Sequence, residues 1–300
     1  MNPTTHIDAL SAFIFLGVFQ GLMLSFFFIL KSRNNIIANR YQGLLILALS
    51  FGILEQLLNL TGYIVKVLPI TNFSEPLNFA YGPLIYLFVK RSIDQIPSRR
   101  DWMHFLVFFF YLAYSSLYFA QSPEYKYNSY VGSYHPDWPF LNVNPSINED
   151  PLGIRELCNE LTLISLVVYL GLSSSELVKK VRQSGKSVFK TDDEVLRFVR
   201  NMIVHFVIIA LIFLVVKLSF SGDLGDYFIA IYISFLIFLT SFRVMNDSAF
   251  FDRSTSFMDV SIGKYLKSSL TESNKQTIHD CIISEMEKNS YFSNNLASLS

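Results

Sequence analysis

The chain has 300 residues, of which 51% are hydrophobic, 16% are aromatic and only 16% are charged. About a quarter of the residues in soluble domains are charged, so this composition excludes an ordinary water-soluble protein and indicates one that crosses a membrane several times. The 24 basic and 24 acidic residues cancel, and the net charge of zero therefore indicates no class of partner.

Seven apolar stretches have nearly the length, roughly 20 residues, that a helix needs to cross the hydrocarbon of a bilayer. In chain order, we expect spans at residues 7–30, 41–65, 73–89, 102–119, 154–178, 195–218 and 227–242. The third holds Pro76 and Pro83, which membrane helices tolerate when neighbouring groups satisfy the freed backbone carbonyls. The pattern predicts an all-α membrane protein, a seven-transmembrane helical bundle that occupies residues 1–243.

Basic residues are unevenly divided between the two sets of alternate loops. One set holds twelve, which are Lys31, Arg33, Arg40, Lys90, Arg91, Arg99, Arg100, Lys179, Lys180, Arg182, Lys186 and Lys190. The other set holds four, which are Lys66, Lys126, Arg155 and Lys217. Because loops rich in Lys and Arg stay in the cytoplasm, we expect the N-terminus and the polar loop 120–153 outside and the C-terminus inside, an N-out/C-in arrangement.

Two carboxylic acids, Glu55 and Glu160, lie inside predicted spans and toward the same outer face. An ionisable group within a span is costly to bury, and by default it is a candidate for function that faces the bundle interior. The alternative is that such groups only form hydrogen bonds between helices. Our hypothesis is a small ligand-binding pocket open to the outside, formed by Glu55, Gln56, Asn59, Tyr81, Asn159 and Glu160.

The sequence holds no glycine-rich phosphate loop, no His, Cys and Asp set with metal spacing, and no nucleophile elbow. We therefore expect no enzymatic activity, no cofactor and no metal site. We expect the predicted spans to be surrounded by membrane lipid. Gly17 and Gly21, four residues apart in the first span, allow a second helix to approach closely, and a homodimer through this face is a further hypothesis.

The chain changes character after Arg243, where no comparable apolar run returns. Residues 244–270 are predicted to be a juxtamembrane linker. Thr271 is a good N-cap, and apolar residues then recur at helical spacing from Ile278 to Met286. We expect residues 271–300 to form short cytosolic helices.

Several short stretches of this tail and of the membrane part match a known pattern. In the tail they are residues 264–265 (KY), 268–272 (SSLTE), 286–288 (MEK), 291–292 (YF) and 295–299 (NLASL), and in the membrane part 17–40 and 81–86 (YGPLIY). In order and spacing the chain resembles bacterial regulators with seven N-terminal spans and a C-terminal AraC-type helix-turn-helix domain. The resemblance implies a sensor in the bacterial inner membrane that answers an unknown small-molecule or envelope signal and regulates transcription.

The tail departs from that family in one respect. An AraC-type domain holds two helix-turn-helix units, whereas this sequence stops within what would be the first helix of the first unit, before any helix that could read bases in the major groove. Phosphate binding needs positive charge, and the tail from Arg243 holds six basic against seven acidic residues. We expect that this chain does not bind DNA specifically and that DNA is a partner only in a form extended beyond Ser300.

Two other functions remain open from the sequence. The seven spans fit a receptor domain that signals to a kinase or another protein partner, and they also fit a small-molecule transporter.

Overall fold

The computed structural model describes residues 5–31, 37–94, 96–183, 193–220 and 222–246, together with Asp280 and Ser284. Within these residues it contains α-helices, short 3-10 helices and turns and no β-strand, so the predicted all-α fold is confirmed. The helices are α1 (Ala9–Lys31), α2 (Ile37–Leu60), α3 (Asn78–Asp94), α4 (Leu106–Phe119), α5 (Pro123–Tyr134), α6 (Cys158–Gln183), α7 (Glu194–Ser219) and α8 (Asp226–Asn246). Apart from Asp280 and Ser284, the predicted linker and cytosolic helices from residue 247 onward lie outside the described residues.

Six helical segments of the described chain are long and apolar enough to cross a membrane. They are Ala9–Leu30, Ile37–Leu60, Asp101–Phe119, Cys158–Gln183, Glu194–Ser219 and Asp226–Asn246. The side chains that these segments turn outward are large and apolar, among them Phe15, Phe109 and Val167, each more than half exposed. A surface of this kind is stable against lipid rather than water, because it carries few groups that water could solvate. The chain is therefore a multi-pass membrane protein.

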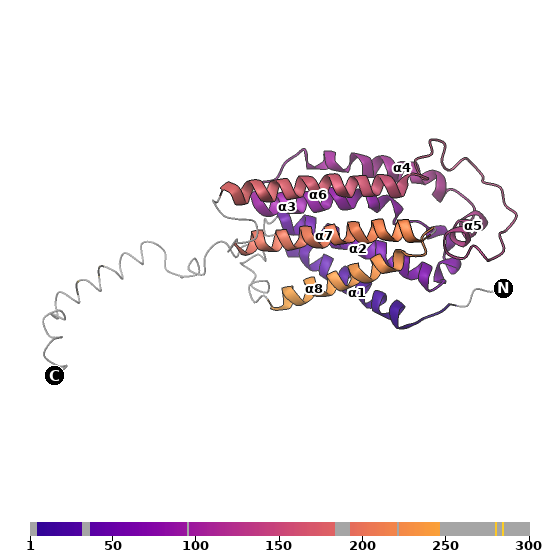
Figure 1. Cartoon of the computed structure of the whole chain (residues 1–300), viewed down its shortest axis with the longest axis horizontal. Coiled ribbons are helices and arrows are strands. Elements are labelled where there is room, and N and C mark those ends of the chain that lie inside the picture. Colours follow the sequence, from indigo (N-terminus) through magenta and orange to yellow (C-terminus); the bar gives the residue numbers. More distant parts are fainter. Residues whose placement is uncertain are drawn as a thin grey trace. The chain divides into compact units, whose positions relative to one another are not determined.

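Helix α3 differs from the predicted third span in position and length. It begins at Asn78, five residues after the predicted start at Phe73, and continues to Asp94. The difference arises because Asn72 adopts a left-handed conformation, with φ of 60°, and Pro76 lies in a separate 3-10 helix, Glu75–Leu77. The 17 residues of α3 are about 25 Å long, less than the full thickness of the hydrocarbon. Most of its side chains are nevertheless buried, since α3 packs against α2, α4, α6 and α7 (Figure 1).

Helix α1 lies against α2 and α8, and its two glycines form that contact. A Cβ atom on Gly17 would lie 2.5 Å from the Ser234 hydroxyl of α8, and one on Gly21 would collide with Ser50 of α2. The close helix approach predicted from the glycine spacing is therefore made within the chain. A homodimer through the same face would have to displace α8 or α2, because both already occupy it.

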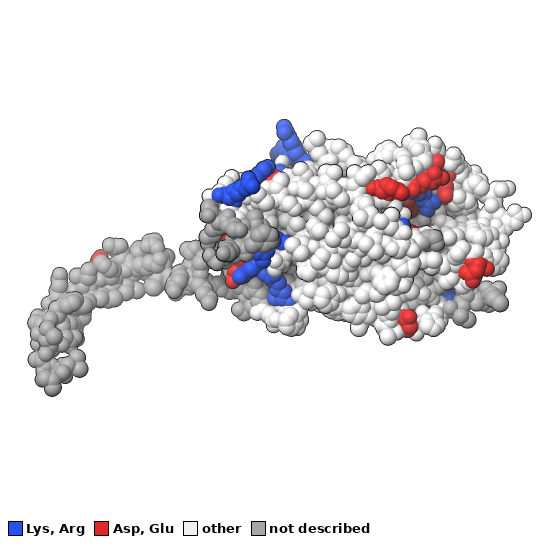
Figure 2. All heavy atoms as spheres, viewed as in Figure 1, with Lys and Arg blue, Asp and Glu red and all other residues white. Residues whose placement is uncertain are grey.

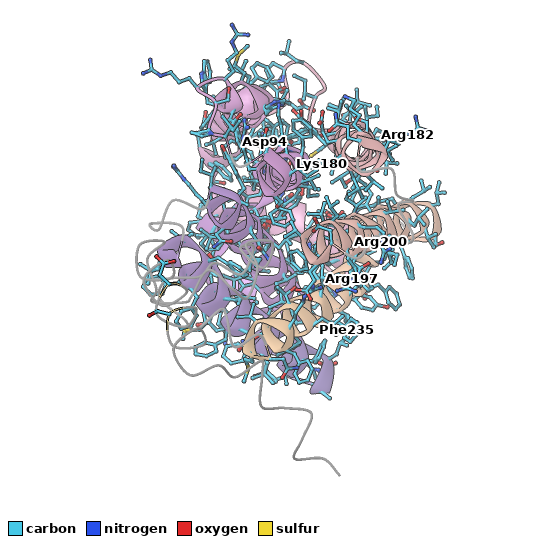
Figure 3. The ribbon with its side chains drawn as sticks, turned by 90° about the vertical axis from the view of Figure 1, so that its left-hand side faces the viewer. Asp94, Lys180, Arg182, Arg197, Arg200 and Phe235 are labelled. Atoms are coloured by element: carbon cyan, nitrogen blue, oxygen red, sulfur yellow. The ribbon has the colours of Figure 1, made fainter. Side chains whose placement is uncertain are left out.

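Charge is distributed along the axis of the bundle. On the face that Figure 2 shows, most Lys and Arg side chains gather at one end of the helices and most Asp and Glu side chains at the other. The basic end includes Lys180 and Arg182 near the end of α6 and Arg197 and Arg200 in the first turns of α7, as the end-on view of Figure 3 shows. The opposite, acidic end carries the short helix α5 and the loop that precedes α6 (Figure 1).

Helix α5 lies within the stretch that was predicted as a polar loop. It begins because the Ser122 hydroxyl caps its N-terminus by accepting a hydrogen bond from the Tyr125 backbone N–H, and because Pro123 is suited to the first turn. The buried Lys126 ammonium then donates to two backbone carbonyls, those of Pro69 at 3.1 Å and Phe119 at 2.9 Å. These bonds hold α5 across the acidic end of the bundle.

Candidate functional site

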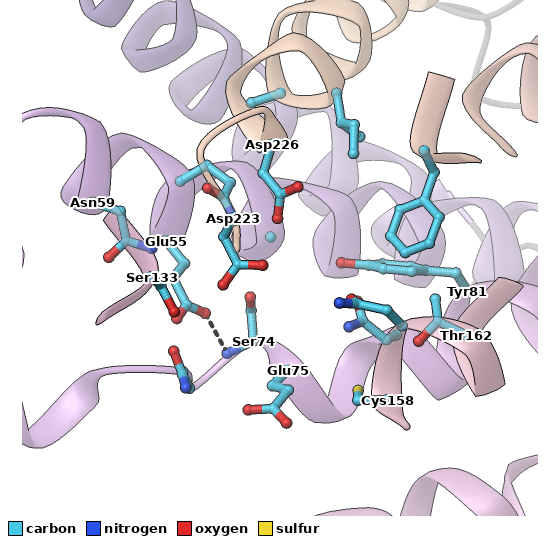
Figure 4. Close-up of a pocket in the computed structure, with 18 of the residues that line it drawn as sticks. Glu55, Asn59, Ser74, Glu75, Tyr81, Ser133, Cys158, Thr162, Asp223 and Asp226 are labelled. Carbon is cyan, nitrogen blue, oxygen red and sulfur yellow. Dashed lines mark hydrogen bonds between the residues drawn. The ribbon is translucent and has the colours of Figure 1, made fainter. Parts of the chain in front are cut away.

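A pocket of about 450 Å³ opens among helices α2, α3, α5, α6, α7 and α8 at the acidic end of the bundle. Its volume falls within the range, roughly 300–1,000 Å³, that is usual for small-molecule sites. Figure 4 shows the polar residues that face it, including Glu55, Asp223, Asp226 and Tyr81. The mouth is polar and the interior is apolar, which is the usual organisation of a ligand site.

Five of the six residues proposed from the sequence line this pocket, namely Glu55, Gln56, Asn59, Tyr81 and Asn159. Glu160 is exposed and is not among the lining residues. The reason is helical geometry: Cys158 and Thr162 of α6 both line the pocket, and Glu160, halfway between them, projects from the opposite side of the helix. The prediction that the remaining five residues bind a ligand is a matter for experiment.

Glu55 is the one acidic residue of α2, Ile37–Leu60, and is only 4% exposed. Its Oε2 atom accepts a hydrogen bond of 2.8 Å from the Ser74 backbone N–H (Figure 4). The left-handed conformation of Asn72 and the following 3-10 helix place the Ser74 N–H beside the Glu55 carboxylate of α2. No basic side chain of the described chain forms an ion pair with Glu55, and its carboxylate is compensated by hydrogen bonds from Ser74 and the Asn72 backbone.

Tyr134, the last residue of α5, connects the outer helix to α2 inside the pocket. Its hydroxyl accepts a hydrogen bond from Asn59 Nδ2 at 3.0 Å and donates one to Gln56 Oε1 at 3.0 Å. One turn earlier, the Tyr130 hydroxyl donates to the Asn59 backbone carbonyl at 3.1 Å. Helix α5 thus covers one side of the pocket and is held to α2 by tyrosine hydroxyls.

Two basic side chains each bind a pair of acids at the mouth. Arg155 lies 2.9 Å from Glu149 Oε2 and 3.4 Å from Glu75 Oε2, and its guanidinium stacks 3.6 Å from the centre of the Tyr118 ring. Tyr111 also donates a short hydrogen bond to Glu75. Because one cation faces two carboxylates, this cluster retains an excess of negative charge.

The second cluster joins the end of α7, the turn that follows it and the first residue of α8. The Lys217 ammonium is 2.7 Å from Asp223 Oδ1 and 2.8 Å from Asp226 Oδ1. Gly222 adopts a φ of 63°, and a side chain there would collide with the Ser133 carbonyl, so this turn can lie directly against α5. As at Arg155, one cation serves two acids.

The pKa of the Tyr134 phenol reflects this negative environment. Burial raises the pKa well above its ordinary value, and the carboxylates of Asp223, Asp226 and Glu55 raise it further by opposing a phenolate. The Tyr134 hydroxyl therefore remains protonated and able to donate throughout the physiological range.

Asp223, Asp226, Arg155 and Tyr134 were not identified as site residues from the sequence. Asp223 lies in a turn, Arg155 in a loop, Tyr134 at the end of the short helix α5 and Asp226 at the first residue of α8. Polar residues are ordinary at such positions, so no local pattern separates these four from solvated loop residues. One signal in the sequence was the density of acids in the segments predicted to lie outside, with Glu149 and Asp150 in the loop 120–153 and Asp223 and Asp226 between the last two predicted spans.

Neither protein-family models, nor curated proteins, nor solved structures give a match to this chain. The pocket and the distribution of charge are therefore the observations from which function is argued.

Proposed function

We propose that this chain is a seven-span sensor of the bacterial inner membrane, with its N-terminus outside and its C-terminus in the cytoplasm, which binds a small molecule in the outer pocket. The observation that carries the proposal is the 450 Å³ pocket at the acidic end of the bundle. The ligand signal would pass along α8 to the C-terminal segment. In a longer chain, that segment would control an AraC-type DNA-binding domain.

The charge distribution supports this orientation. The end of the bundle that carries Lys180, Arg182, Arg197 and Arg200 is the one that membrane insertion would retain in the cytoplasm. The pocket lies at the opposite end and would then face the outside. Helix α3 supports a seventh crossing, because it is enclosed by α2, α4, α6 and α7 and continues the alternation of basic and acidic ends.

Helix α8 offers a direct route between the pocket and the C-terminal segment. Its first two turns contribute Asp226, Ile229, Ala230 and Ile233 to the pocket, and it ends at Asn246, about 20 Å from Ile233. Further along, α8 packs on α1 through the close approach of Gly17 to Ser234. A ligand that binds two packings of α8 with different affinity would shift the population between them and move the inner end of the helix.

The output at DNA rests on the resemblance of residues 264–299 to AraC-type regulators. Those residues lie outside the described part of the chain, apart from Asp280 and Ser284. The negative balance of the tail supports the view that this chain by itself does not bind DNA specifically.

Orientation can be tested with epitope tags. A tag inserted after the exposed Asp137 should be cut by protease added to spheroplasts, and a tag after Ser300 should be protected until the inner membrane is opened. External access to the tag after Ser300 would overturn the N-out/C-in arrangement and the proposed cytosolic output with it.

Signalling can be tested by measuring a distance across the inner end. Spin labels at Lys179→Cys and Met245→Cys, with Cys158 and Cys281 replaced by Ser, report the separation of α6 and α8 in lipid nanodiscs; both labelled positions are exposed. Suitable probes are 2-phenylethylamine, 2-phenylethanol and phenylacetate, which share an apolar body and differ in charge. We expect a probe that occupies the pocket to shift the distance distribution, and Ile53→Trp, which fills the pocket, to remove the shift. A probe that binds in the pocket without any shift would contradict the sensor function.

A further inference from the structure

The outer pocket carries a charge pattern that selects one class of ligand. Seven of its lining residues are acidic, namely Glu55, Glu75, Glu149, Asp150, Glu156, Asp223 and Asp226, and one, Arg155, is basic. Arg155 and Lys217 each bind two of these acids at 2.7–3.4 Å, and the pocket therefore holds more acidic groups than cations to pair with them. A field of this sign, focused by low-dielectric walls, attracts cations and repels anions.

The acids are concentrated at one place and leave hydrogen-bond acceptors unused. Figure 4 shows the carboxylates of Glu55, Asp223 and Asp226 turned toward a common space. Asn59, only 4% exposed, also lines the pocket, and its Oδ1 atom has no partner in the described structure. A buried acceptor without a donor is costly, so the missing component is a group that donates hydrogen bonds. An ammonium group supplies both the positive charge and the donors.

Below this polar mouth the walls are apolar. Leu49 and Ile53 lie deeper along α2 than Glu55, and Ile233 lies two turns deeper along α8 than Asp226. Phe206 and Ile209 continue the apolar lining on α7. The site therefore combines an anionic entrance with an apolar interior, and a bare cation would leave the interior unfilled.

The geometry also argues against a metal ion as the cation. No group of three His, Cys, Asp or Glu side chains among the described residues is close enough to hold one. The carboxylates instead surround a space wide enough for an organic group.

We propose that the outer pocket binds a small organic amine, with its ammonium group among Glu55, Asp223 and Asp226 and its apolar body between α2, α7 and α8. This inference rests on the proposed function only in taking the pocket as the ligand site; it adds the chemical class of the ligand.

The test is calorimetric titration of the whole chain in nanodiscs with the three probes of matched body. We expect 2-phenylethylamine to bind saturably, and phenylacetate and 2-phenylethanol to bind at least tenfold more weakly. Glu55→Gln should weaken amine binding at least tenfold, because it removes a carboxylate that pairs with no basic side chain among the residues that the structure describes. The matched control is Glu160→Gln, which removes an acid of the same membrane half that does not line the pocket and should leave amine affinity unchanged.

The outcomes separate the ligand class from the signalling role. Equal binding of the three probes, unchanged amine binding in a folded Glu55→Gln protein, or an equal loss in Glu160→Gln would overturn the amine site. If Glu55→Gln does not fold, Asp223→Asn serves as the second variant, since Asp223 lies in the turn between α7 and α8 rather than within a membrane helix, and it should weaken amine binding in the same direction. Amine binding without a shift in the α6–α8 distance would reject the sensor function and leave the amine site standing. A shift in the α6–α8 distance caused by phenylacetate alone would reject the amine site and leave the sensor function standing.

Discussion

Arg91 and Asp101 form a two-pronged ion pair at the end of the bundle opposite the pocket. The guanidinium Nη2 lies 2.5 Å from Asp101 Oδ1, and Nε lies 3.0 Å from Oδ2. Tyr41 of α2 donates to the same carboxylate at 2.9 Å, and Arg91 also binds Asp94 at 3.0 Å. The pair and Tyr41 join α2, α3 and the 3-10 helix Asp101–Phe105 that precedes α4. Water hardly reaches this contact, because Arg91 is 2% exposed and Asp101 8%.

Removing one partner of this pair should be far more harmful than removing both. Arg91→Ala leaves the Asp101 carboxylate buried without its cation, and we expect a loss of roughly 3–5 kcal/mol in the free energy of unfolding. The double variant Arg91→Met with Asp101→Leu should lose much less, since no charge remains to be desolvated. Unfolding by denaturing detergent in mixed micelles measures both. A double variant as unstable as Arg91→Ala would contradict this account.

Close packing of α1 predicts that a side chain is tolerated far less well at Gly21 of α1 than at Gly171 of α6. Gly21→Val should destabilise the bundle by roughly 1–3 kcal/mol, because the new side chain overlaps Ser50 and Ile237. Among the described residues, nothing outside the local backbone of α6 lies within 4 Å of a Cβ added at Gly171, so Gly171→Ala is the control. It should stabilise α6 by about 0.5–1 kcal/mol through lower backbone entropy of the unfolded chain. Thermal unfolding in nanodiscs distinguishes the two, and equal effects would show that the α1 contact is loose.

Tyr134, at the end of α5, should stabilise the contact by which α5 covers one side of the pocket. Tyr134→Phe removes the acceptor for Asn59 Nδ2 and the donor to Gln56 and leaves buried polar groups unpaired. We expect a loss of about 1–3 kcal/mol and faster hydrogen exchange in α5. Tyr63→Phe is the control, since that ring is half exposed and no hydrogen bond to its hydroxyl occurs in the described structure. Hydrogen exchange in α5 is measured by mass spectrometry. If it is unchanged in Tyr134→Phe, the Tyr134 hydroxyl does not hold α5 over the pocket.

The membrane helices were predictable where an apolar run is bounded by charge. The run 227–242 lies inside α8, which begins at Asp226 and passes Arg243 before it ends. The start of α3 was misplaced because a left-handed Asn72 cannot be recognised from hydropathy, and because Pro76 belongs to a 3-10 turn rather than to the helix. Apolar content predicts that a segment is buried but not where its backbone turns.

The sequence predicts pocket residues only where a polar side chain interrupts an apolar span. Glu55 and Asn59 were found because polar side chains are rare inside a span. Tyr134 was missed because it contacts Asn59 across 75 residues of sequence, from a segment where tyrosines are common. Glu160 was included because it shares a span end with Asn159, and only the rotation of α6 shows that it faces away from the pocket.

Alkaline pH should destabilise the outer part of the protein through the buried phenols of α5. Burial raises the pKa of Tyr130 to about 12, whereas a tyrosine of the unfolded chain has an ordinary pKa of about 10. Between pH 10 and 12 the unfolded chain therefore releases a proton that the folded chain retains. Since stability falls with pH wherever the unfolded state binds fewer protons, the contribution of Tyr130 is complete below pH 10 and is lost as the pH rises toward 12. Its size is on the order of 2 kcal/mol.

The measurement is thermal unfolding between pH 9 and 12, with ionisation of tyrosine followed by absorbance near 295 nm. We expect the unfolding temperature to fall over this interval and part of the tyrosine absorbance change to appear only on unfolding. Other groups also titrate here, so Tyr130→Phe is the informative comparison. It should be less stable than the native chain near neutral pH, because the bond to the Asn59 carbonyl is lost, and less sensitive to pH above 10. A Tyr130→Phe protein with the same pH slope as the native chain would show that the Tyr130 phenol ionises freely and that α5 does not shield it from water.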